Sequence, residues 1–68
     1  MKLIDHEWCC TLNKCRNTWL ANDASDITAD FDPDSAESSV ILVISEGATY
    51  MKNADGRWQK VGTTEVIE

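Results

Sequence analysis

Apolar residues are most concentrated at residues 40–44, where the sequence reads VILVI without a polar interruption. Four of these five residues are β-branched, which predicts a strand over residues 40–45. A strand with one face in solvent alternates apolar and polar residues, so an uninterrupted apolar run predicts cover on both faces. We also expect another strand to pair beside it, because a long apolar edge promotes aggregation.

Two segments are candidates for that neighbouring strand. In residues 26–31, DITADF, the apolar residues Ile27, Ala29 and Phe31 alternate with polar ones. The tail at residues 63–68, TTEVIE, is the alternative. The regular alternation favours residues 26–31.

Turn residues divide the segment that follows the apolar run. Glu46-Gly47 predicts a tight turn, and residues 49–52 resume with strand-forming residues. The sequence NADG at residues 53–56 predicts a type I turn followed by a bulge. In the resulting hairpin Lys52 faces Trp58 and Tyr50 faces Lys60. Tyr50 and Trp58 then share one face of the sheet, and Met51 and Val61 share the other.

The N-terminal segment carries one apolar stripe at helical spacing: Ile4, Trp8, Leu12, Cys15 and Trp19. Cys, Thr, Trp and Asn are mediocre helix formers, so an irregular segment is the alternative to a short helix. In either form we expect its aromatic residues to cover one face of the sheet.

These elements predict one small domain over residues 1–68 that is mainly β. We expect an antiparallel meander of three or four strands, with a helical or irregular N-terminal segment packed on one face; an α+β fold is the alternative. Its three parts are a Cys- and Trp-rich segment (1–20), an acidic turn-rich segment containing the expected strand 26–31 (21–39), and the meander (40–61). So short a chain buries only about 60% of its unfolded surface, which favours stabilisation by association.

Acidic residues outnumber basic ones by 12 to 6, and the net charge is -6. Such a surface repels phosphate groups, so we expect neither nucleic acid nor membranes as partners. No apolar stretch approaches the roughly 18 residues that span a bilayer, and the N-terminus lacks the apolar core of a secretory signal. We therefore expect a reducing, cytosolic environment.

The histidine and all three cysteines lie within DHEWCCTLNKC, residues 5–15. His6, Cys9, Cys10 and Cys15 are sufficient in number for zinc, but zinc sites usually present two separated ligand pairs. A disulfide from Cys15 to Cys9 or Cys10 is an alternative, which a reducing compartment disfavours. Free cysteines are among the most buried residue types, so we interpret these as packing residues and expect no metal or cofactor.

Asp30, Asp32 and Asp34 alternate as at the start of an EF-hand calcium loop. However, Ser35 stands where that loop needs glycine, and Ile41 stands where it needs glutamate. A solvated acidic turn is the better interpretation. With a single histidine and no arrangement typical of a catalytic site, we expect no enzymatic activity.

The aromatic residues are the remaining candidates for binding. Tyr50 and Trp58 on one strand face would suit a carbohydrate or a peptide, although such residues more often cover the core of a small domain. Trp8 and Trp19 in the N-terminal segment are further candidates for contact residues.

The C-terminal third resembles the closing hairpins of short proteins encoded among the structural genes of tailed bacteriophages and prophages. The matching positions are the strand Val40–Ser45, Gly47, Tyr50-Met51, the turn Asn53–Gly56, and Trp58. The opening MKLIDHEWC and the ITAD of residues 27–30 are also similar to this group.

The resemblance implies a non-enzymatic virion structural or assembly protein. It would associate with itself or with other virion proteins, and the apolar strand and the aromatic N-terminus would carry the contacts. It would occur in the host bacterial cytoplasm during assembly, and in the virion if it is retained there. The alternatives are a small carbohydrate- or peptide-binding module and, third, a zinc-stabilised mini-domain.

Overall fold

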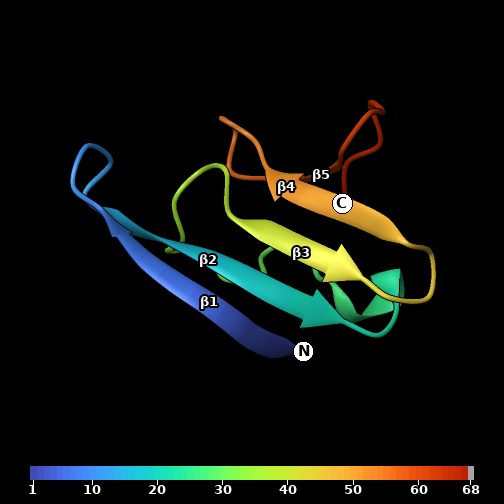
Figure 1. Cartoon of the computed structure of the whole chain (residues 1–68). Coiled ribbons are helices and arrows are strands. Elements are labelled where there is room, and N and C mark those ends of the chain that lie inside the picture. The colour runs from blue at the N-terminus through green and yellow to red at the C-terminus, as the bar shows by residue number, and fades with distance from the viewer. Residues whose placement is uncertain (68) are drawn as a thin grey trace.

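The computed structural model describes residues 1–67 as a five-stranded sheet with one face covered by an extended connection (Figure 1). The strands lie in the sheet in chain order: β1 (Lys2–Cys9), β2 (Lys14–Ala21), β3 (Val40–Val43), β4 (Ala48–Lys52) and β5 (Trp58–Lys60). Strands β2 and β3 are parallel, and all other neighbours are antiparallel. The prediction of a mainly β domain is confirmed.

The hairpin between β4 and β5 has the register that its turn residues predict. Tyr50 pairs with Lys60, and Lys52 pairs with Trp58. Asn53 Oδ1 accepts hydrogen bonds from the backbone N–H groups of Asp55 and Arg57, each at 3.0 Å. Gly56 has a φ of +78°, a conformation that glycine adopts without steric cost. Local chemistry alone therefore specifies this hairpin.

The N-terminal prediction is wrong. Residues 2–9 and 14–21 form a β-hairpin, so this segment extends the sheet and does not cover a face of it. The chain reverses at residues 10–13, where Asn13 has a φ of +54° and its N–H donates to Cys10 O at 3.3 Å. The apolar stripe of this segment does not distinguish a helix from a strand, because most of its spacings are four residues. A spacing of four returns to the same side of a strand as well as of a helix.

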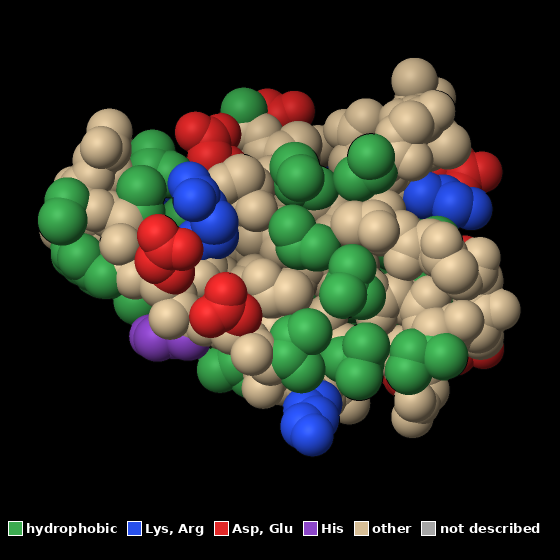
Figure 2. Space-filling view, in the orientation of Figure 1, with side chains coloured by type: hydrophobic (Ala, Val, Ile, Leu, Met, Phe, Trp, Pro, Cys, Tyr) green, Lys and Arg blue, Asp and Glu red, His purple; other side chains and the backbone are tan. Residues whose placement is uncertain are grey.

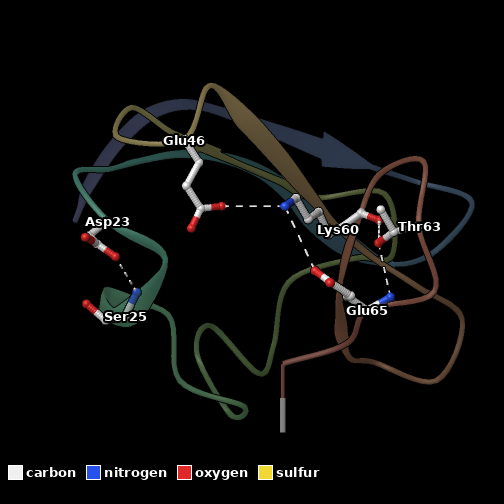
Figure 3. Close-up of polar contacts among 6 residues, drawn as sticks. All are labelled: Asp23, Ser25, Glu46, Lys60, Thr63 and Glu65. Carbon is white, nitrogen blue, oxygen red and sulfur yellow. Dashed lines mark hydrogen bonds and ion pairs between the residues drawn. The ribbon is translucent and has the colours of Figure 1, made fainter.

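The expected strand at residues 26–31 is also absent from the structure. Asp23 Oδ1 accepts from the N–H of Ser25 and begins the short 3-10 helix η1 (Ala24–Asp26) (Figure 3). Turns then continue as far as residue 39. Residues 22–39 thus form the crossover that a parallel pair of strands requires, and β2 is the neighbour of β3. Neither residues 26–31 nor residues 63–67 pair with β3. Residue 68, the last of the second candidate segment, lies outside the described residues.

The crossover packs on one face of the sheet and encloses the core. This covered face carries Ile41, Val43, Tyr50 and Trp58, and the crossover contributes Ile27. Trp58 is fully buried, and its Nε1 donates to the backbone O of Phe31 at 2.9 Å. The Phe31 ring in turn meets Trp19 edge to face, with ring centroids 5.0 Å apart.

The C-terminal segment covers the outer edge of β5. Gln59 forms a β-bridge with Val66, and the N–H of Ile67 donates to Trp58 O at 2.8 Å. Lys60 approaches Glu46 at 3.7 Å and Glu65 at 4.0 Å (Figure 3). These ion pairs are partly exposed and contribute little, so the backbone bonds hold the segment in place.

Candidate functional site

The structure places the two predicted platform residues inside the protein. Tyr50 is 5% exposed and Trp58 is 0% exposed, both on the covered face of the sheet. They therefore form core packing and present no surface to a sugar or peptide. Of the other two aromatic candidates, Trp19 is half-buried against Phe31, whereas Trp8 is 54% exposed.

The cysteines and the histidine do not converge. All three cysteines are free thiols; Cys9 and Cys15 are half-buried on adjacent strands, and Cys10 is exposed in the turn. The packing interpretation is therefore wrong for Cys10. His6 Nδ1 lies 2.6 Å from Asn17 Oδ1. Within residues 1–67, no group of three His, Cys, Asp or Glu side chains is arranged to hold a metal ion.

Asp32 is the centre of a polar network on the covered face. Its carboxylate Oδ2 accepts from Asn17 Nδ2 at 2.9 Å and from Trp19 Nε1 at 2.8 Å. Because the Asn17 amide nitrogen donates to Asp32, its Oδ1 accepts from His6. Asp32 has a φ of +49°, which Asp and Asn tolerate better than most residues. This member of the predicted acidic turn thus joins the crossover to β2.

Lys52 joins the same loop to β4. It is 5% exposed, and its Nζ donates to Asp32 O at 2.7 Å, to Ser35 O at 3.3 Å and to Ser35 Oγ at 3.0 Å. Burial lowers its pKa below the ordinary value for lysine, and the nearby Asp32 carboxylate partly offsets this effect. All three ammonium donors are occupied, so Lys52 acts in this structure as a structural anchor.

A shallow hollow of about 380 Å³ lies beside Trp8, at the end of the covered face that the crossover leaves accessible. Its lining includes Lys14, Cys15 and Asn17 of β2, together with Asp32 and Asp34 of the crossover. The hollow therefore combines an exposed indole ring with two carboxylates and one lysine.

No segment of residues 1–67 packs on the other side of the sheet, and we call this side the open face (Figure 1). The strand registers place six apolar side chains on this face: Leu20, Val40, Leu42, Ile44, Met51 and Val61. Leu42 is 36% exposed, and Ile44 and Val61 are 58% and 54% exposed. The sequence prediction that both faces of residues 40–45 are covered is therefore wrong for this single chain.

Figure 2 shows the open face directly. Hydrophobic side chains form a band across the middle of the molecule, and side chains of both charges lie beside them. The register of β1 with β2 places these charged residues of the two strands on the open face: Lys2, Asp5, Glu7, Lys14 and Arg16. The sequence predicts the apolar strand as a contact element but identifies none of the individual apolar residues of this face as site residues. The sequence feature that indicated them is the uninterrupted apolar run VILVI, because a strand with one face in solvent alternates apolar and polar residues.

Comparison with protein-family models, with curated proteins and with solved structures gave no match. Within residues 1–67, no helix has the length and apolar character needed to cross a membrane.

Proposed function

We propose that this chain is a non-enzymatic interaction module that associates with a second copy of itself through the open face of its sheet. The observation that supports this is the band of six apolar side chains on β2–β4 and the residues that follow β3 and β5. Exposed apolar patches on small soluble domains often mark protein contacts. Two such faces packed together would form a β-sandwich, with sheets about 10 Å apart.

The size of the open face suits a dimer. The molecule measures 33 × 24 × 19 Å, so its broad side has dimensions of 33 by 24 Å. A standard protein interface covers about 800 Å² on each partner, which this side can supply. A 68-residue chain also has a small core of its own, so burying a second apolar layer would add substantially to its stability.

The distribution of charge also favours the open face over the covered one as the contact between copies. The crossover, residues 22–39, carries six acidic residues and no basic residue, so two covered faces would repel each other. The open face carries acidic and basic residues side by side on β1 and β2. A two-fold arrangement can therefore set the bases of one copy against the acids of the other.

The resemblance to short phage proteins would make this association a step in virion assembly within a bacterial host. That part of the proposal concerns the biological setting and not the contact itself. The genes that flank the coding sequence test it: capsid or tail genes would support the assembly role, and a metabolic operon would contradict it.

Sedimentation velocity over a range of protein concentrations tests the contact. We expect a concentration-dependent dimer for the unmodified chain and a monomer for Leu42→Lys, which places a charge in the middle of the open face. Ala54→Lys is the matched control, because it adds the same charge to the exposed β4–β5 turn. A chain that remains monomeric at every concentration, or equal weakening by both variants, would overturn the proposal.

A further inference from the structure

The outer edge of β1 is the longest strand edge in the structure that lacks a partner. β1 spans eight residues and pairs with β2 on one side; within residues 1–67 no strand pairs with its other side. Every residue from Lys2 to Trp8 is exposed. The opposite edge of the sheet, at β5, is covered by the C-terminal segment.

The edge of β1 has some of the features that prevent strand addition and lacks others. Proteins usually protect edges with short strands, charged side chains, prolines, bulges or inward-pointing charges, and of these β1 carries charged side chains at Lys2, Asp5 and Glu7. β1 contains no proline, and its single irregularity lies between Leu3 and Asp5. The segment Asp5–Cys9 is therefore a regular extended strand whose outward backbone groups can pair with another chain.

A second copy of β1 fits this edge poorly. Asp5 and Glu7 lie on the same side of the strand, the open face. An antiparallel pair of β1 strands centred on His6 places Asp5 opposite Glu7 of the other copy, and a pair centred on Glu7 places two glutamates opposite each other. Like charges directly opposite destabilise strand pairing, so both of these registers are unfavourable for self-pairing.

β2 shows which residues fit β1. It places Arg16 opposite Glu7 and Thr18 opposite Asp5, so one of the two carboxylates has a cation opposite it. A strand on the outer edge faces the same two carboxylates from the other side, and basic residues at alternate positions would complement both. Its intervening residues would lie beside His6 and Trp8, where apolar side chains can cover the exposed indole.

We propose that the outer edge of β1 binds an extended segment of a partner protein in which Lys or Arg alternate with apolar residues. This segment adds a sixth strand by main-chain pairing, and its basic side chains face Asp5 and Glu7. The hollow beside Trp8, on the covered side of the sheet, is lined by Asp32 and Asp34 and also by Lys14, so its two carboxylates exceed its cations by one. Asp5 and Glu7 lie on the open face, but the backbone edge of β1 lies outside the band of six apolar side chains, so this binding does not require contact between those bands.

An acetylated and amidated peptide of alternating lysine and valine, about seven residues long, serves as the probe. Backbone amide NMR of the full chain should show shifts and slowed hydrogen exchange concentrated on β1. Two further peptides carry N-methyl groups on alternate residues, one at the odd-numbered positions and the other at the even-numbered positions. One should lose binding and the other should keep it, because only one set of N–H groups faces β1.

A charge exchange tests the identity of the partner. The double variant Asp5→Lys with Glu7→Lys should bind the lysine–valine peptide about tenfold more weakly, and should gain binding to a glutamate–valine peptide. The control double variant Asp30→Lys with Asp55→Lys changes the net charge equally at exposed positions away from β1 and should keep the original affinity. The Leu42→Lys variant should also keep it, since Leu42 lies on β3, which does not pair with β1.

Three results would overturn the proposal: no binding of the peptide, equal binding of both N-methylated peptides, or shifts concentrated on the open face. A monomeric chain in the sedimentation experiment would overturn self-association alone, so the two proposals fail separately.

Discussion

The two faces of the sheet carry apolar residues for different purposes. On the covered face, Ile41, Val43, Tyr50 and Trp58 are buried under the crossover within one chain. On the open face, Leu42 and its neighbours are equally apolar but remain accessible. The continuous apolar sequence of β3 thus serves a core on one side and, by our proposal, a contact between copies on the other. By that proposal, the apolar strand indicates cover on both faces, of which its own chain supplies only one.

The largest expected effect comes from removing the principal core residue of the covered face. Trp58→Ala should lower the free energy of unfolding by about 3–5 kcal/mol, because it leaves a large cavity and an unpaired Phe31 carbonyl. Leu42→Ala on the open face should lower it by about 1 kcal/mol or less in the dilute monomer, because the residue is already partly exposed. Urea unfolding of both variants measures the difference, and equal losses would show that the two faces are equally important to the monomer.

An intermediate effect is expected from the polar network under the covered face. Asp32→Ala should lower the free energy of unfolding by about 2 kcal/mol, because Asn17 and Trp19 lose a charged acceptor. Asp32→Asn should lose less, since asparagine tolerates the positive φ and retains one acceptor oxygen. Asp30→Ala, at an exposed position, is the matched control. A loss for Asp30→Ala as large as for Asp32→Ala would exclude a specific role for the network.

The smallest effect concerns the pH dependence contributed by Lys52. Its pKa is lower in the folded protein than in the unfolded chain, so the unfolded chain binds more protons between the two values. The stability contributed by this group therefore rises with pH between its lowered pKa in the folded protein and 10.5, the ordinary pKa of lysine. Urea unfolding at about pH 7 and about pH 9.5 should show this rise in the unmodified chain relative to Lys52→Met. If the free energy of unfolding changed identically with pH in both proteins, this pH dependence would not come from Lys52.

The parts of the fold that the sequence predicted are those that local chemistry specifies. The turn at residues 53–56 contains the asparagine and the glycine that its geometry requires, so the pairing of Lys52 with Trp58 followed directly. The central position of β3 followed from the apolar character of residues 40–44. The N-terminal hairpin was missed because its reversal at residues 10–13 contains no glycine or proline, and the stripe of apolar residues also matched a helix.

The candidate site was predicted in part. The expectation that the apolar strand carries contacts agrees with the exposure of Leu42 and Ile44, although self-association itself stays a prediction. The Tyr50 and Trp58 platform was wrong because the two residues share a face, as predicted, but that face is the one the crossover covers. The importance of Asp32 had no local signal, since its partners Asn17 and Trp19 lie 15 and 13 residues away in the sequence.

By itself, the sequence determined the β character of residues 40–61, the register of the last hairpin and the sharing of a face by Tyr50 and Trp58. Each depends on turn chemistry and on the two-residue period of a strand, which act over a few residues. Only the tertiary structure decided that β2 pairs with β3, that residues 22–39 cover one face, and that the other face and the edge of β1 stay accessible. Those outcomes depend on where a long connection packs, and distant residues such as Phe31, Trp58 and Asp32 determine that position together.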